Sequence, residues 1–194
     1  MPPTEHDRTV LRDLAHRVAE LAGEPVMQQR RDAAVAINEL RSERPQVYCF
    51  AEGAWLECIP PESLQCRDDL LRGWETRLRM ALYAHEVFGD DQIVDAVFNV
   101  PWHLGFSGYG VDVEMDVPEA GEKHTYFIHP CTSLSLQSNA QLTAYSWTPP
   151  LRERADLDNL TFERVLVDEV TSLQWLEMAR DLFGDILTVR RRGT

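Results

Sequence analysis

Residues 178–194, MARDLFGDILTVRRRGT, decide the fold that the sequence predicts. A helical pattern ends at Gly184, as helices often do at a glycine, and the apolar run Ile186–Val189 follows at once. A strand that follows a helix so closely is typical of a βαβ unit, whose second strand lies parallel to an earlier one. The segment therefore predicts a parallel sheet to which upstream strands contribute.

Two further apolar runs are predicted to be those upstream strands. Val47–Phe50 follows the helix-breaking Pro45, and Ile93–Val100 is ended by Pro101. A short continuous apolar run is typical of a strand that is buried on both faces of a parallel sheet. We expect these two runs and Ile186–Val189 to be adjacent parallel strands of one sheet.

Helical periodicity fills most of the chain around these strands. Apolar residues recur every three or four positions in residues 5–22, 25–41, 67–88 and 170–183. The sequence predicts one α/β domain with this order: N-terminal helices (1–44), two βα units (45–110), a turn-rich insertion (111–155), and a final helix and strand (156–194).

The chain is acidic, with a formal net charge of −13 at pH 7. A nucleic-acid surface needs a basic patch or stripe, so this charge argues against nucleic acid as a partner. No apolar run reaches the roughly 18 residues that span a bilayer, and MPPTEHDRTV at the N-terminus lacks an apolar signal region. We therefore predict a cytoplasmic protein with no membrane partner. Its four cysteines form no CxxC pair and are predicted to be reduced.

Four stretches together resemble the uroporphyrinogen decarboxylase superfamily, and most of all its divergent bacterial branch related to corrinoid-dependent methyltransferases. The resemblance covers roughly residues 8–193 and rests on layout, since no stretch is a diagnostic catalytic signature. In chain order the stretches are ERPQVYCFAEGAWLE (43–57), DDLLRGWETRLRMALYAHEVFGDDQIVDAVFNVPWHLG (68–105), SWTPPLRERADLDNL (146–160) and LEMARDLFGDILTVRRRG (176–193).

The resemblance implies a (β/α)8 barrel of the TIM type, of which this chain would hold the N-terminal part. Val47–Phe50, Ile93–Val100 and Ile186–Val189 would be its first three strands, with two leading helices and an insertion after the second strand. A whole barrel takes about 250 residues, so we expect the chain to be a truncated barrel. Its open strand edge predicts a homo-oligomer. The alternative is a complete small α/β domain whose last strand is an edge strand.

In such barrels the active site lies at the C-terminal ends of the strands. Glu52 and His103 follow two of the predicted strands and are the catalytic candidates, as a general base or proton shuttle. Either could equally be an ordinary loop residue facing water. The substrate-binding candidates at the same strand ends are Trp55, Asn99, Trp102 and Arg190.

The resemblance implies methyl transfer between a corrinoid and a small acceptor in the full-length form. The alternatives are a uroporphyrinogen decarboxylase and a non-catalytic binding or assembly module. The decarboxylases carry an arginine after the first strand and an aspartate after the second. Here AEGAW (51–55) has no arginine, and FNVPWH (98–103) offers only Asn99, so both departures count against tetrapyrrole decarboxylation.

No cofactor or metal is predicted for this chain itself. Corrinoid and zinc would belong to the full-length family, and the predicted partner is a small molecule or a corrinoid protein. His129 and Cys131 have the spacing of an HxC metal pair, but two ligands do not make a zinc site.

Overall fold

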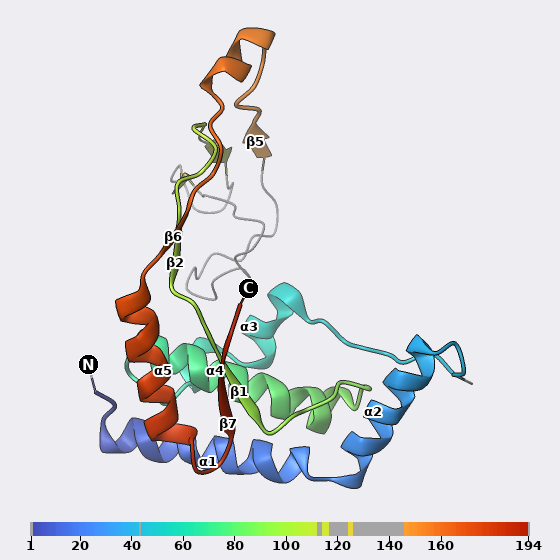
Figure 1. The fold of residues 1–194 in the computed structure, drawn as a ribbon. Helices are drawn as coiled ribbons and strands as arrows, with labels where there is room; N and C mark the ends of the chain where they lie inside the picture. The colour runs from blue at the N-terminus through green and yellow to red at the C-terminus, as the bar shows by residue number, and fades with distance from the viewer. Residues whose placement is uncertain (1, 43, 112–113, 117–123, 126–145, 194) are drawn as a thin grey trace. The chain divides into compact units, whose positions relative to one another are not determined.

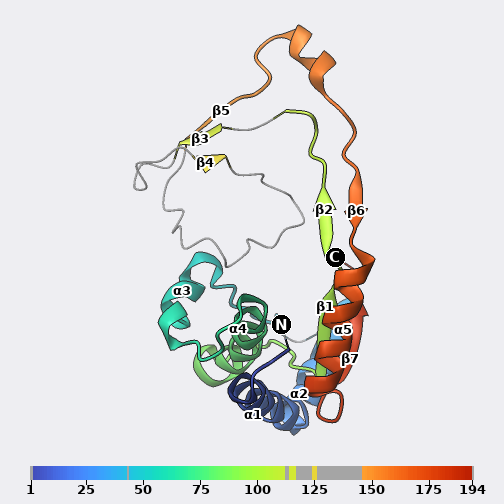
Figure 2. The same cartoon turned by 90° about the vertical axis from the view of Figure 1, so that its left-hand side faces the viewer.

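A computed structural model describes residues 2–42, 44–111, 114–116, 124–125 and 146–193. The chain forms two compact units (Figures 1 and 2). The first unit comprises residues up to Val100 together with Gln174–Arg192, and the second comprises Pro101–Leu173 with the last two residues. Each unit is described by itself.

The first unit contains the larger helices and a pair of strands. Its elements are α1 (Glu5–Ala22), α2 (Pro25–Asn38), a 3-10 turn (Glu52–Ala54), α3 (Trp55–Cys58), a 3-10 turn (Pro61–Ser63), α4 (Asp69–Tyr83), a π-helical turn (Ala84–Phe88), β1 (Val97–Pro101), α5 (Glu169–Phe183, from Gln174 onward) and β7 (Thr188–Arg192).

Side chains at the helix starts fix where α1 and α4 begin. Thr4 and Asp7 form a capping box, in which the Asp7 N–H donates to Thr4 Oγ1 (3.1 Å) and the Thr4 N–H donates to Asp7 Oδ2 (3.2 Å). Asp7 Oδ1 also accepts from the Arg67 N–H (3.1 Å), just before Asp68 caps α4. The same carboxylate therefore starts α1 and holds it beside the beginning of α4.

The core of the first unit lies between α1, α4, α5 and β1. Trp74, Phe98 and Phe183 form an aromatic cluster at its centre, with ring centroids 5.4 Å (Trp74–Phe98), 5.9 Å (Trp74–Phe183) and 4.5 Å (Phe98–Phe183) apart. Buried aliphatic side chains surround the cluster: Leu11, Leu14, Val18, Leu71, Leu78, Leu82, Leu176 and Leu182. The helical periodicity of the sequence therefore marked the buried faces of these helices.

β1 and β7 pair with each other as a two-stranded sheet. Both strands run in the same direction (Figures 1 and 2), and the Thr188 N–H donates to the Ala96 carbonyl oxygen (2.9 Å) where the strands begin. This confirms that the second and third apolar runs lie side by side. Both strands begin later than predicted, β1 at Val97 and β7 at Thr188. In β7 the reason is that the N–H groups of Ile186 and Leu187 donate to the Phe183 carbonyl in the turn after α5.

The prediction of a strand at Val47–Phe50 is wrong. This stretch is irregular chain in which Val47 is 62% exposed and Phe50 is 76% exposed. Its backbone N–H groups donate to carboxylates, Val47 to Asp91 Oδ2 (2.9 Å) and Cys49 to Asp90 Oδ2 (2.8 Å). These side-chain acceptors take the place of the backbone hydrogen bonds that a strand would form with a neighbouring strand.

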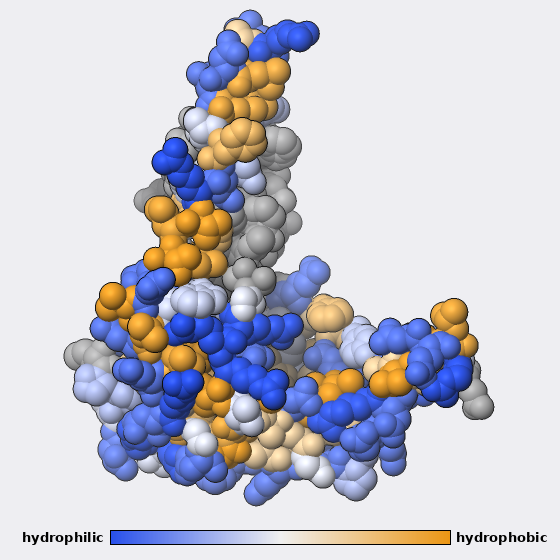
Figure 3. Space-filling model, in the orientation of Figure 1, coloured by the Kyte–Doolittle hydropathy of each residue, from blue (hydrophilic) through white to orange (hydrophobic). Residues whose placement is uncertain are grey.

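The second unit is built from short antiparallel strands. β2 (Leu104–Phe106) pairs with β6 (Val165–Val167), and β3 (Glu114–Asp116) pairs with both β4 (His124–Thr125) and β5 (Ser146–Thr148). A 3-10 turn spans Arg154–Asn159. The side chains of β6 are apolar and exposed, and they form an orange patch over β2 and β6 in Figure 3. Of the insertion predicted at 111–155, the described residues 111, 114–116, 124–125 and 146–155 belong to this unit, and the others lie outside the described residues.

These elements make a mixed α/β fold, as predicted. Across the described ranges, no helix combines the length and the apolar character needed to cross a bilayer. Cys49, Cys58 and Cys66 are free thiols.

Candidate functional site

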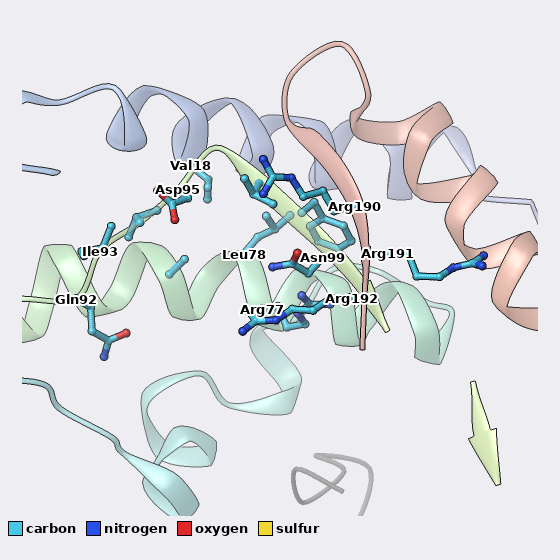
Figure 4. A pocket seen from close by; sticks show the side chains of 14 residues that line it. Val18, Arg77, Leu78, Gln92, Ile93, Asp95, Asn99, Arg190, Arg191 and Arg192 are labelled. Carbon is cyan, nitrogen blue, oxygen red and sulfur yellow. The ribbon is translucent and has the colours of Figure 1, made fainter. Parts of the chain in front are cut away.

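A cavity of about 580 Å³ lies in the first unit beside the two-stranded sheet (Figure 4). Residues from α1, α4, the segment before β1, and both strands line it: Val18, Arg77, Leu78, Ala81, Gln92, Ile93, Val94, Asp95, Val97, Phe98, Asn99, Arg190, Arg191 and Arg192. Its volume falls in the range of small-molecule sites, which is about 300–1,000 Å³.

The alternation of side chains along β7 aims two arginines at the cavity. Arg190 and Arg192 are exposed and share one face of the strand, whereas Val189 and Arg191 are half-buried on the other. In Figure 4 the side chains of Arg190 and Arg192 leave β7 on the side of Asn99, and Arg191 extends the opposite way. Asn99 belongs to the neighbouring strand β1, so the sheet itself sets the spacing of these groups.

Arg77 brings a third guanidinium to the cavity from α4. Its guanidinium carbon lies 4.9 Å from the centroid of the Phe98 ring, which is a cation–π contact. Surrounding protein atoms desolvate the guanidinium and lower the pKa of Arg77, yet an arginine remains a cation at neutral pH. The close-up shows its side chain beside that of Arg192 (Figure 4).

No carboxylate of the described residues forms an ion pair with Arg77, Arg190 or Arg192. The cavity has one acidic lining residue, Asp95, and its Oδ1 already pairs with Arg31 Nη2 (2.7 Å). Other arginines of the first unit do have carboxylate partners: Arg8, Arg12, Arg17, Arg31, Arg41, Arg44 and Arg79. In a chain of net charge −13, the cavity is therefore a local concentration of positive charge.

The rest of the lining is largely apolar. Val18 and Leu78 are buried core residues, and Ile93 and Val97 extend the same wall. Figure 4 shows Val18, Ile93, Gln92 and Asp95 at the opposite end of the cavity from Arg191. The arrangement can hold a small molecule with an anionic group near β7 and an uncharged body along the wall.

Two of the predicted site residues, Asn99 and Arg190, meet in this cavity. Glu52 and Trp55 lie elsewhere in the first unit and do not line it. Glu52 is exposed in its 3-10 turn with a φ of 43°, and the Trp55 ring packs against Tyr83 (5.9 Å) and Phe88 (5.5 Å). Glu52 and Trp55 therefore do not form the predicted pocket: Trp55 packs among aromatic rings, and Glu52 faces solvent in its turn.

His103 and Trp102 belong to the second unit, where His103 lies at the start of α5. The His103 N–H donates to Ser172 Oγ (2.9 Å), and its Nδ1 is 3.6 Å from Asp168 Oδ2. Asp168 also accepts from the Thr171 hydroxyl (2.6 Å) and the Thr171 N–H (2.9 Å), and these bonds lower the pKa of its carboxyl. His103 therefore takes part in a helix-capping network. Because Glu52 and His103 belong to different units, their convergence on one ligand stays a prediction.

His129 and Cys131 lie outside the described residues. Within the described part of the chain, no group of three or more histidine, cysteine, aspartate or glutamate side chains is placed to hold a metal ion.

Of the arginine run at 190–192 only Arg190 was predicted as a site residue, and Arg77 was not predicted at all. Arg192 could have been found from its two-residue spacing to Arg190, which puts both on one face of a strand. Arg77 carried a fainter signal: it has no acidic residue three or four positions away on its helix, whereas Arg79 has Glu75.

No family model, curated protein or solved structure matches the chain.

Proposed function

We propose that the first unit is a binding module for a small organic anion, which Arg77, Arg190 and Arg192 hold in the cavity. The observation that carries this proposal is the group of three guanidinium groups that no described carboxylate neutralises. It corresponds to the non-catalytic binding module that the sequence analysis kept as an alternative.

The repulsion between the arginines favours an anion between them. Arg190 and Arg192 are two residues apart on one strand face, a Cα separation of about 7 Å. Two unit charges at this distance repel by about 0.6 kcal/mol in water and by about 2.4 kcal/mol at the effective dielectric constant of a protein surface. A bound anion adds attraction to each guanidinium, which offsets this repulsion.

The donor groups suit an oxyanion with an organic body. Guanidinium groups donate two parallel hydrogen bonds to carboxylate or phosphate oxygens, and the Asn99 amide adds a further donor beside them. The apolar wall formed by Val18, Leu78 and Ile93 favours a ligand that buries hydrocarbon there.

A matched pair of ligands tests the proposal. Benzoate and its neutral analogue benzamide share a ring, so isothermal titration of the purified chain with each isolates the role of the charge. We expect benzoate to bind and benzamide to bind at least about tenfold more weakly, a difference of about 1.4 kcal/mol. Equal binding of the two would contradict the proposal.

Variants locate the binding. Arg190→Gln/Arg192→Gln is expected to weaken benzoate binding by at least about tenfold. Arg180→Gln is the control, because Arg180 is exposed on α5 and does not line the cavity. Loss of affinity in the control alone would place the anion site elsewhere.

The finer predictions from the family resemblance remain proposals of their own. The parallel pairing of β1 and β7 supports a barrel fragment, whereas the irregular chain at 47–50 gives it no first strand. Methyl transfer with a corrinoid, tetrapyrrole decarboxylation, zinc use and a cytoplasmic location stay predictions. The exposed apolar side chains of β6 support the predicted homo-oligomer.

A further inference from the structure

We propose that the ligand of the cavity is a phosphate monoester with an uncharged, largely apolar body. This inference rests on the proposed function and narrows it to one class of anion. Three features of the cavity favour this ligand: the arginines of its lining, the carboxylate of Asp95 toward one end, and the apolar wall.

The number of unneutralised cations favours two negative charges on the ligand. Arg77, Arg190 and Arg192 repel one another across the cavity, and each negative charge on a ligand adds attraction to all three. A dianion therefore provides twice the attraction of a monoanion against the same repulsion. Because Asp95 pairs with Arg31, it does not reduce the positive charge of Arg77, Arg190 and Arg192.

The distribution of charge favours placing both negative charges on one group. In Figure 4 Asp95 and Gln92 lie toward one end of the cavity, and Arg77, Asn99 and Arg192 lie together nearer the other. A second carboxylate at the far end of a ligand would approach the Asp95 carboxylate, which repels it. A ligand with a compact doubly charged head and a neutral tail avoids this repulsion.

A phosphate monoester is the common biological group with these properties. It carries a charge of about −1.5 to −2 at pH 7, and its three oxygens accept charge-assisted hydrogen bonds from arginine. Donors from α4, β1 and β7 reach the head group from different elements, which matches a tetrahedral group better than a planar carboxylate.

Phenyl phosphate and phenyl sulfate are the matched probes, because they share the ring and the tetrahedral oxygens and differ by one charge. Isothermal titration of the whole chain at pH 7.5 is expected to give at least about tenfold tighter binding of phenyl phosphate. Near pH 5 the phosphate loses its second charge, since that pKa is about 6, and the two affinities should approach each other.

The change of affinity between pH 5 and pH 7.5 should come from the ligand and not from the residues that line the cavity. The charged lining residues are four arginines, a residue type that is cationic throughout this pH range, and Asp95, which pairs with Arg31. The described residues that line the cavity include no histidine.

Each outcome of the titration decides the inference. Equal affinities of the two probes at pH 7.5, or a difference that persists at pH 5, would overturn it while leaving the proposed function intact. Failure of both probes and of benzoate would overturn the proposed function as well. Inorganic phosphate should bind more weakly than phenyl phosphate. Equal binding of the two would contradict the claim that the ligand has an apolar body.

Variants test the assignment of the head group. Arg192→Gln should weaken phenyl phosphate more than phenyl sulfate and so reduce the ratio of their affinities, and Arg180→Gln should leave that ratio unchanged. Arg192→Lys keeps the charge and should restore part of the ratio. An unchanged ratio in an Arg192→Gln protein that melts cooperatively would contradict the assignment.

Discussion

The Arg77 guanidinium carbon lies 4.9 Å from the centroid of the Phe98 ring, which joins the proposed anion site to the hydrophobic core. The same ring packs against Phe183 at a centroid distance of 4.5 Å. Phe98 therefore supports a cation with its π system and stabilises the unit through its contacts with other aromatic rings.

Phe98→Leu should lower both stability and anion affinity. We expect a loss of about 1–3 kcal/mol in the free energy of unfolding from the removed ring contacts. Anion affinity should fall about two- to fivefold, because Arg77 loses a contact worth about 0.5–1 kcal/mol. Urea unfolding and isothermal titration measure the two effects.

Phe88→Leu is the matched control, because Phe88 packs against Trp55 and Tyr83 and does not line the cavity. It should lower stability and leave anion affinity unchanged. Equal effects of the two variants on affinity would show that Phe98 acts through general stability alone.

Glu75→Gln should destabilise the first unit strongly. The Glu75 side chain is fully buried in α4, accepts from the N–H groups of Gln65 and Cys66 (2.8–3.0 Å), and pairs with Arg79 (2.7 Å). Burial would raise the pKa of this carboxyl, but those hydrogen bonds and Arg79 outweigh it and lower the pKa. Glutamine replaces an acceptor oxygen with a donor, so we expect a loss of about 2–4 kcal/mol in urea unfolding.

Glu86→Gln provides the comparison for Glu75. Glu86 pairs with Arg17 on the surface (2.6 Å), where both side chains are about half exposed. Its loss should cost under about 1 kcal/mol. Similar losses for the two variants would contradict the role given to the buried carboxylate.

Protonation of Asp185 in acid should lower the free energy of unfolding, because the carboxylate loses its charge. Its carboxylate accepts two bonds from Arg12, Nη1 to Oδ1 (2.8 Å) and Nη2 to Oδ2 (2.6 Å), and this pairing lowers the pKa of Asp185 to about 2. Because the folded pKa lies below the unfolded value of about 3.9, the contribution is complete only above about pH 5. It is lost as the pH falls through the folded pKa.

Urea unfolding of wild type and Asp185→Asn between pH 2 and pH 6 measures this contribution. The stability difference between the two proteins should be constant above about pH 5 and shrink toward pH 2. Asp13→Asn is the control, since Asp13 is exposed on α1. A wild-type advantage that grows as the pH falls would show the opposite linkage.

The sequence predicted those parts of the fold that depend on local pattern. The apolar runs at 93–100 and 186–189 lead into β1 and β7, and Phe98, Val100 and Leu187 from these runs are buried. The run at 47–50 has the same local pattern, but Asp90 and Asp91, some 40 residues later, bind its N–H groups. A local pattern carries no information on such a distant competitor.

The residues of the candidate site were also predicted only in part. Asn99 and Arg190 were found because they occupy predicted strands or their ends, and the pairing of β1 with β7 brings them together. Arg77 was missed because the direction in which a helix presents an arginine depends on how α4 packs against β1. Glu52 and Trp55 were placed at the end of a strand that does not form.

A crystal structure of the chain with 4-bromophenyl phosphate tests the central claim most directly, because the anomalous signal of bromine fixes the orientation of the ligand. We predict the phosphate within hydrogen-bond distance of Arg77 and Arg192, with Arg190 or Asn99 as a further donor. The bromine should lie along the apolar wall toward Ile93. A phosphate bound away from these arginines, or a bromine signal outside the cavity, would contradict the account.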